Sequence, residues 1–254
     1  MALLTVENIE VDFGGIRALD ELGFTVEAGQ ICALIGPNGA GKTTLFNCVS
    51  RVYTPQQGSI RFDGIELLDM PPHRVARAGI ARTFQNVALF PALTVLQNVM
   101  TGAYSRGGAG VLANALRLPG VGRRERVLAQ RGRELLERLS LGEFADRPAA
   151  GLPYGTLKRL EIARALAAEP RLLMLDEPAG GLTHGEVDEL AATIQAIRQE
   201  FDLTVLLVEH HMSMVMGISD KLVVLDFGRK IAEGTAAEVS ADPRVIEAYL
   251  GTPA

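Results

Sequence analysis

The chain has 254 residues, of which 48% are hydrophobic and 22% are charged, an ordinary composition for a globular protein with a large core. The formal net charge of −5 gives no basic surface of the kind that binds nucleic acid, so we expect no nucleic-acid partner. The two cysteines, Cys32 and Cys48, lack the spacing of a metal site and indicate small core residues in a reducing compartment.

No apolar run approaches the length that is needed to cross a bilayer. The segment from Met1 to Glu7 has neither the basic region nor the long apolar region of a secretion signal. We therefore expect a cytoplasmic protein that serves a membrane, if at all, by docking on another protein.

Residues 3–35 have the pattern of β structure. Apolar residues alternate with small or polar ones over 22–27, and the apolar run 31–35 predicts a buried strand. Phe13 comes just before two glycines, where an exposed ring could stack on a nucleotide base. An ordinary core position is the alternative interpretation of this phenylalanine.

The residues after this strand fit G-x-x-x-x-G-K-[ST], a loop that cradles phosphate between a strand and a helix. Its glycines let successive backbone N–H groups point at an anion, and the helix N-terminus adds roughly half a positive charge. Lys42 would reach the outer phosphates, and the Thr43 hydroxyl would complete a Mg²⁺ shell. The strand–loop–helix context disfavours the alternative, an ordinary glycine turn. The predicted ATP-binding loop consists of Gly36, Pro37, Asn38, Gly39, Ala40, Gly41, Lys42, Thr43 and Thr44.

The chain changes character near Gln85. Residues 59–64 predict a strand and a turn, and 79–85 predict a short strand that ends in a loop at Gln85. The pattern is then helical to about residue 165, so we expect an inserted helical subdomain over about 86–165. Within it, 105–122 is rich in glycine and predicts a connection, and 124–139 predicts an amphipathic helix.

Apolar strands alternate with helices over the rest of the chain. The runs 172–175, 203–208 and 222–225 are apolar almost throughout, which is typical of parallel strands covered on both faces. A turn over 226–229 and an amphipathic tail over about 235–254 close the chain. We therefore predict an α/β fold.

Acidic and polar side chains follow these predicted strands. Asp176 would hold Mg²⁺, and Glu177 is well placed to polarise a water for attack on the γ-phosphate. A pair of acids that caps a helix is the alternative. His210 follows the next strand at the same carboxyl edge, where it could bond the γ-phosphate or the water, and Gln85 could coordinate the metal through its amide oxygen.

A further stretch, residues 152–160, precedes Asp176 by about twenty residues and leads into a helix. With it, the chain resembles the ATP-binding cassette (ABC) ATPase subunits over nearly its whole length. The matching parts are 36–44 (Walker A), 172–177 (Walker B with the catalytic Glu177), Gln85 (Q-loop), His210 (switch His), Phe13 (A-loop aromatic) and 152–156 (signature LSGGQ). The resemblance assigns nucleotide contacts to Phe13 and to the signature residues Leu152, Tyr154, Gly155 and Thr156.

The resemblance implies a P-loop NTPase fold and one ABC ATPase domain over 1–254. That domain would have a mostly parallel core sheet, an N-terminal antiparallel β subdomain and the inserted helical subdomain. The chain departs from the family at Pro153, which replaces the usual Ser and has neither a hydroxyl nor an N–H to donate. Tyr154 and Thr156 also replace Gly and Gln, and Thr183 replaces the usual Asp of the D-loop. The three signature changes would weaken the expected contact with the γ-phosphate or leave it to a partner subunit, whereas Thr183 would affect the coupling between the two sites of a dimer.

Within the family, 83–99, 160–166 and the tail 248–251 are similar to the branched-chain amino acid transporter ATPases, and the insertion after Ala103 fits the longer of that system's two ATPases. The resemblance implies an ATP hydrolase that uses Mg²⁺ and energises import of branched-chain amino acids or related small polar solutes. Its partners would be a second ABC ATPase subunit (identical or not), transmembrane permease subunits and, indirectly, a solute-binding protein. The chain itself would then be cytoplasmic and peripheral on the inner face of the cell membrane.

Several other functions remain open from the sequence. Urea or amide import and lipopolysaccharide export use similar ATPases. A non-transport ABC clamp protein is a rival from another class, but such proteins tend to carry two cassettes or long added domains. A degenerate cassette that only binds ATP and a phosphate-loop kinase are further alternatives.

Overall fold

The structure is a computed structural model, and it describes residues 1–104 and 121–250. The glycine-rich connection predicted over 105–122 therefore lies almost entirely outside the described residues, as do residues 251–254 of the predicted tail.

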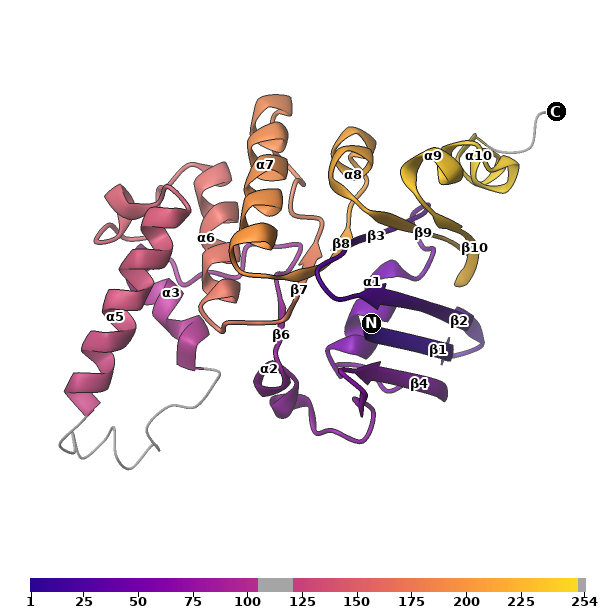
Figure 1. Cartoon of the computed structure of the whole chain (residues 1–254), viewed down its shortest axis with the longest axis horizontal. Coiled ribbons are helices and arrows are strands. Elements are labelled where there is room, and N and C mark those ends of the chain that lie inside the picture. Colours follow the sequence, from indigo (N-terminus) through magenta and orange to yellow (C-terminus); the bar gives the residue numbers. More distant parts are fainter. Residues whose placement is uncertain (105–120, 251–254) are drawn as a thin grey trace.

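A six-stranded sheet forms the centre of the molecule (Figure 1). Its strands are β3 (Ile31–Ile35), β6 (Ile80–Arg82), β7 (Leu172–Asp176), β8 (Thr204–Val208), β9 (Lys221–Asp226) and β10 (Arg229–Gly234). They lie in the order β10-β9-β3-β8-β7-β6, and all neighbours are parallel except β9 and β10. Every residue of β3, β7 and β8 is buried, which confirms the prediction of a parallel sheet covered on both faces.

Strand β10 differs from the sequence-based expectation of a turn and tail after β9. Phe227 and Gly228 turn the chain with positive φ angles of 42° and 80°, and β10 then pairs antiparallel with β9 at the sheet edge. Only Ala232 of β10 is fully buried, and Arg229 and Lys230 are exposed. A polar edge strand has too few apolar residues to show the alternation on which the prediction depended.

A second, antiparallel sheet has the order β2-β1-β4-β5. Its strands are β1 (Ala2–Phe13), β2 (Ile16–Glu27), β4 (Gln57–Phe62) and β5 (Ile65–Glu66). Helix α1 (Lys42–Val49) lies between this sheet and the central sheet in Figure 1. The antiparallel sheet and the parallel sheet together are consistent with the predicted P-loop NTPase fold.

The core consists of two clusters, one on each face of the central sheet. In β3, Ile31, Ala33 and Ile35 belong to one cluster, and Cys32 and Leu34 belong to the other. The first cluster includes helices α7 (His184–Glu200) and α8 (Met212–Ile218), and the second includes α1 and the antiparallel sheet. Burial raises the pKa of Cys32 to about 12, as expected for an inert core thiol.

Helices gather beyond the β6 edge of the central sheet (Figure 1). They are α3 (Val95–Ala103), α5 (Val121–Arg138), η3 (Gly142–Phe144) and α6 (Tyr154–Leu166), and α3 packs on both α5 and α6. The approach of α3 to α6 requires Gly102, because a Cβ there would lie 1.9 Å from the Arg164 carbonyl oxygen.

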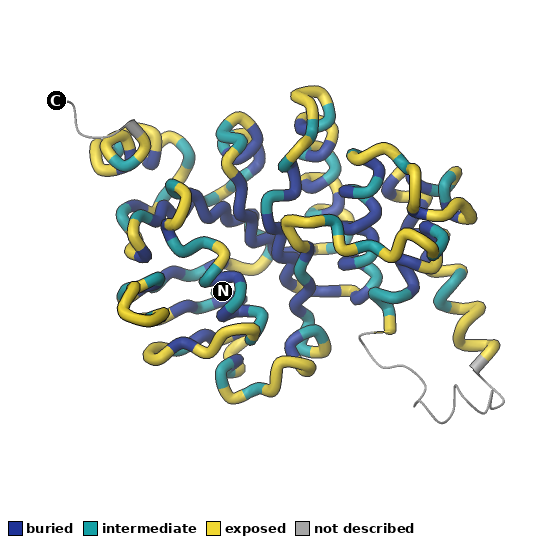
Figure 2. The backbone as a smooth tube through the Cα atoms, turned by 180° about the vertical axis from the view of Figure 1, so that it is seen from behind, coloured by how far each residue is buried: buried dark blue, intermediate teal, exposed yellow. Residues whose placement is uncertain are grey.

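The other helices of the described residues are η1 (Pro72–Arg74), α2 (Val75–Ala78), α9 (Ala236–Ser240) and α10 (Pro243–Leu250). Figure 2 shows that the buried residues concentrate in the strands, while the outer faces of the surrounding helices are exposed. In residues 1–104 and 121–250, no helix combines the length and the apolar character that a membrane span requires.

Candidate active site

Three segments that were predicted to carry chemistry meet at one edge of the central sheet. Leu34 of β3, Val208 of β8 and Asp176 of β7 lie in one row of the sheet, because Leu34 pairs with Val208 and Val208 pairs with Asp176. The loop after β3, the acids after β7 and His210 after β8 therefore leave the sheet at the same level. Parallel strands place their carboxyl ends together, and this edge is where ligands of open α/β sheets bind.

The predicted phosphate loop runs from β3 into α1, and its backbone requires glycine at two positions. At Gly36 the φ angle is 151°, and a Cβ would lie 2.1 Å from the Leu225 carbonyl oxygen. At Gly41 the φ angle is 99°, and a Cβ would lie 2.5 Å from the Ala18 carbonyl oxygen. Helix α1 then begins at Lys42, so the N–H groups of its first turn are turned toward the loop.

Lys42 bends back over this loop. Its Nζ donates hydrogen bonds to the carbonyl oxygens of Gly36 at 2.7 Å and Pro37 at 2.9 Å. Partial burial lowers the pKa of Lys42, and the negative charge of Glu177 opposes that shift. The ammonium of the loop and the carboxylate after β7 therefore lie close enough to interact electrostatically.

Asp176 is buried and held from two sides by the segment that contains β6. The Arg82 guanidinium forms an ion pair with Asp176 Oδ2 at 2.7 Å and also donates to Asn47 Oδ1 of α1 at 2.8 Å. The backbone N–H of Asp176 donates to Thr83 Oγ1 at 3.3 Å. Arg82 thus connects β7 to the helix that carries Thr43, and nothing in the linear pattern marks it among the other arginines.

Glu177 lies beside Gln85 and His210. The Gln85 side-chain amide donates to Glu177 Oε2 at 2.8 Å, and His210 Nδ1 lies 3.9 Å from the same oxygen. Glu177 has a φ angle of 47°, a left-handed conformation that is rare for a residue with a side chain. The Glu177 side chain is one quarter exposed, and that of His210 is more than half exposed, so a water can reach both.

Glu209 is a buried carboxylate that the sequence reasoning did not identify. Its Oε1 accepts the backbone N–H of Ala179 at 2.8 Å, and its Oε2 accepts those of His210 at 2.7 Å and His211 at 3.0 Å. Its oxygen and the ring nitrogens of the two histidines lie within 4.8 Å of one another, a spacing compatible with a metal ion. Because both carboxylate oxygens already accept backbone N–H groups, Glu209 fits a role as a clip between two loops better than a metal ligand.

Phe13 ends β1 and is 45% exposed, which excludes the core interpretation. Its ring meets that of Tyr53 edge to face, with centroids 5.2 Å apart. The strand that follows it passes the phosphate loop, since the carbonyl of Ala18 lies against Gly41. An exposed ring on this side of the loop is available for stacking on a base.

The C-terminal helix also reaches the phosphate loop. Burial raises the pKa of Tyr249 in α10, and a hydrogen bond with the backbone of Gly36 opposes the rise. The tail after β10 is therefore in contact with the first glycine of the loop.

The signature residues lie at the start of α6. Pro153 is the N-cap of this helix and Tyr154 is 44% exposed, whereas Thr156 is buried and Leu152 is partly buried. A Cβ on Gly155 would lie 2.9 Å from Glu186 Oε1, so the signature packs against the N-terminus of α7. There Thr183 forms a capping box with Glu186. Figure 1 places α6 and α1 on opposite sides of β7.

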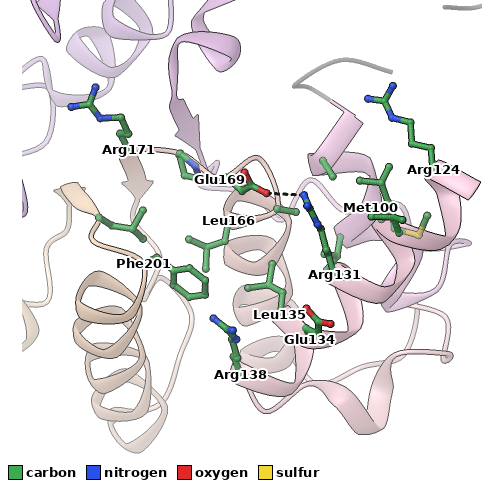
Figure 3. A pocket seen from close by; sticks show the side chains of 18 residues that line it. Met100, Arg124, Arg131, Glu134, Leu135, Arg138, Leu166, Glu169, Arg171 and Phe201 are labelled. Atoms are coloured by element: carbon green, nitrogen blue, oxygen red, sulfur yellow. Dashed lines mark hydrogen bonds and ion pairs between the residues drawn. The ribbon is translucent and has the colours of Figure 1, made fainter. Parts of the chain in front are cut away.

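A pocket of about 650 Å³ lies elsewhere, between α3, α5, the end of α6 and the segment before β8 (Figure 3). Its floor is apolar and includes Met100, Leu135 and Leu166, and Arg131 forms an ion pair with Glu169 at its rim, 3.4 Å apart. The residues predicted to bind ATP and Mg²⁺ do not line it.

Comparison with known proteins identifies the family. A family model described as ABC transporter matches residues 19–180, which span the phosphate loop, the signature and both acids. The chain belongs to the ABC transporter ATPases. This ABC ATPase also matches, over residues 229–254, a model described as branched-chain amino acid ATP-binding cassette transporter. The predicted family and its branched-chain amino acid branch are thereby confirmed.

Relatives match the ABC ATPase over its full length. It is 45% identical to the high-affinity branched-chain amino acid transport ATP-binding protein BraF of Pseudomonas aeruginosa, and 41% identical to LivG of Escherichia coli K12, with 98% of each chain covered in both cases. A crystal structure of the ADP conformation of MJ1267, an ATP-binding cassette of an ABC transporter, superposes with a TM-score of 0.86 at 31% identity, covering 99% of both chains. These similarities confirm the predicted fold and an ATP hydrolase of the ABC type.

Proposed function

We propose that this ABC ATPase energises the import of branched-chain amino acids or related small polar solutes. The observation that carries the proposal is the similarity over the whole chain to BraF and LivG, whose names give high-affinity branched-chain amino acid transport. The separate match of residues 229–254 to the branched-chain model supports it.

Residues at the strand ends would hold the phosphates and Mg²⁺. The backbone of 36–44 and the Lys42 ammonium would cradle the β- and γ-phosphates. The Thr43 hydroxyl, the Asp176 carboxylate and the Gln85 amide oxygen are all oxygen donors, which is the ligand chemistry that Mg²⁺ prefers. When bound, Mg²⁺ would neutralise charge that develops on the phosphate oxygens. Phe13 would stack on the adenine.

Glu177 and His210 would act on the water and the γ-phosphate. The Gln85 hydrogen bond at 2.8 Å orients the Glu177 carboxylate. As a general base, this carboxylate would accept a proton from the attacking water. The ring of His210, 3.9 Å from the same carboxylate, would contact the γ-phosphate or that water. Phosphoryl transfer depends mainly on such positioning and electrostatic stabilisation.

A second ABC ATPase subunit, identical or not, would complete the site. The signature residues lie at the start of α6, on the opposite side of β7 from the phosphate loop that precedes α1 (Figure 1). This placement supports a head-to-tail pair, in which Leu152, Tyr154, Gly155 and Thr156 of one subunit cover the ATP of the other. The helical subdomain over about 86–165 would carry the closing motion to permease subunits at the inner face of the membrane.

Transport by a reconstituted complex tests the proposal. The chain would be combined in vesicles with permease subunits, a second ABC ATPase and a solute-binding protein from the same organism. We expect ATP-dependent uptake of labelled leucine, and loss of uptake with Glu177→Gln in this chain. Uptake of urea or an amide, with no leucine uptake, would assign the complex to one of the related systems instead.

A further inference from the structure

Helix α6 carries two charged side chains that are almost completely buried. Lys158 and Glu161 are each only 2% exposed, and a spacing of three residues places them on one face of the helix. Lys and Glu are almost never buried to this extent unless they are paired. Their burial therefore needs partners, and those partners identify what this face of the helix does.

The partners of Lys158 are backbone carbonyl groups of two different site segments. Its Nζ donates to the carbonyl oxygen of Gln85 at 3.1 Å and to that of Glu177 at 3.5 Å. The ammonium also lies 5.6 Å from the ring centroid of Tyr154, the first residue of α6, in cation–π geometry. One side chain thus joins the signature helix to the loop after β6 and to the loop after β7.

Glu161 completes the linkage from the next turn of the helix. Its Oε1 accepts the backbone N–H of Phe84 at 3.2 Å, and Arg164 lies 3.8 Å from the same oxygen. Burial raises the pKa of Glu161, and the charges of Lys158 and Arg164 oppose the rise. The carboxylate therefore supplies both a countercharge for Lys158 and a second bond to the segment that ends at Gln85.

The backbone of Glu177 needs such support. Its φ angle of 47° is rare for a residue with a Cβ, and it sets the direction of the side chain. The Glu177 N–H donates to the Val208 carbonyl oxygen at 2.9 Å, and its own carbonyl accepts the Gly180 N–H at 3.1 Å as well as the Lys158 ammonium. Of these bonds, only the one from Lys158 comes from the helical region.

We propose that Lys158 is a positioning residue for Glu177. Its hydrogen bond makes the backbone of Glu177, and therefore the orientation of the Glu177 carboxylate, depend on the position of α6. The proposal rests on the role of Glu177 given under Proposed function. Helix α6 begins at the signature residues. Contact of these residues with the nucleotide held by a second subunit would therefore fix the orientation of the Glu177 carboxylate in their own subunit. Lys158 thereby connects the two nucleotide sites of the pair.

The test compares Lys158→Met, which keeps the aliphatic stem and removes the ammonium, with Lys230→Met. In the wild type, the Lys230 ammonium bonds the surface carboxylate of Glu233. In the nucleotide-free protein, we expect Lys158→Met to speed hydrogen exchange at the Glu177 and Gly180 amides, while the amides of β8 keep their protection. We expect kcat for ATP hydrolysis to fall by about 10- to 100-fold, because small displacements of a reacting group cost this much. The KM for ATP should stay within about 2-fold. Lys230→Met should match the wild type.

Unchanged exchange at both amides together with an unchanged kcat would overturn the proposal, as would a rise in KM that accounts for the whole loss of activity. Should Lys158→Met unfold because the buried Glu161 carboxylate keeps only Arg164 as a countercharge, Lys158→Met combined with Glu161→Gln removes that charge, and the same results are expected. Failure of the proposed function is distinguishable, because it would appear as full turnover by Glu177→Gln while the exchange result on Lys158→Met still stands.

Discussion

The side-chain amide of Gln85 donates a hydrogen bond to the Glu177 carboxylate at 2.8 Å, although the two residues are 92 positions apart in the chain. They meet because β6 and β7 are neighbouring parallel strands, so the segments that follow them leave the sheet side by side. This hydrogen bond therefore links Gln85, where the helical region starts, to the Glu177 carboxylate that we propose as the general base.

Removing this bond should impair hydrolysis more than binding. For Gln85→Ala we expect ATP turnover to fall by about 10-fold or more, because the Glu177 carboxylate loses the donor that orients it. Gln85→Glu replaces the donor by a second carboxylate, whose repulsion should lower turnover further. Steady-state assays of both variants check this, and an ATPase rate that tolerates Gln85→Glu would contradict the proposed orientation.

Arg82 should be essential for the stability of the site. Arg82 and Asp176 have side-chain exposures of 9% and 6%, so Arg82→Met leaves a buried carboxylate without its partner. We expect the free energy of unfolding to fall by about 3–5 kcal/mol. The matched control is Arg61→Met, which breaks an ion pair with Glu7 in which both side chains are about half exposed, and should cost about 1 kcal/mol or less. Urea unfolding that gives similar losses for the two variants would show that burial of the pair is unimportant.

Glu209 should act through both of its oxygens. Glu209→Gln keeps the size of the side chain but replaces one acceptor by an NH₂ group that faces backbone N–H donors. Since each buried donor left without an acceptor costs about 1–3 kcal/mol, we expect a loss of about 2–4 kcal/mol in unfolding free energy. Glu247→Gln, at an exposed position of α10, should change it by about 0.5 kcal/mol or less. Equal stability of the two variants in urea would refute the role of Glu209 as a clip.

The buried carboxyl of Glu161 should leave a signature in the pH dependence of stability. Its pKa is raised in the folded protein, so between the ordinary carboxyl pKa and the raised value the folded state binds more protons than the unfolded state. The free energy of unfolding should therefore fall as pH rises through this window. We expect Glu161→Gln to lack this part of the fall in unfolding free energy. Urea unfolding of the variant and the wild type from about pH 4 to pH 7 measures the difference. Parallel stability curves for the two proteins would contradict the assignment.

Much of the fold was predictable because its elements are strongly patterned. The buried strands β3, β7 and β8 are short apolar runs, and the loop that joins β3 to α1 has a glycine spacing that few other structures require. The edge strand β10 escaped prediction because charged side chains occupy half of its positions and leave too few apolar residues to show an alternation.

The candidate site was predictable only where a motif marks it. Arg82, Lys158 and Glu209 have the appearance of ordinary surface charges in the sequence, yet all three are buried or nearly so. Their partners lie 94, 19 and 30 residues away, respectively, in segments that only the sheet order brings together. Local patterns carry no information on such contacts, so the residues that hold the acids in place become visible only in the structure.

The central claim is that the loop at residues 36–44 holds the ATP that Glu177 helps to hydrolyse. The most direct measurement follows ATP binding and single-turnover hydrolysis in the wild type, Lys42→Ala and Glu177→Gln, with Mg²⁺ present. We expect Glu177→Gln to bind ATP as tightly as the wild type but to hydrolyse it at least about 100-fold more slowly, and Lys42→Ala to lose binding. Rapid hydrolysis by Glu177→Gln, or full binding of ATP by Lys42→Ala, would contradict the claim.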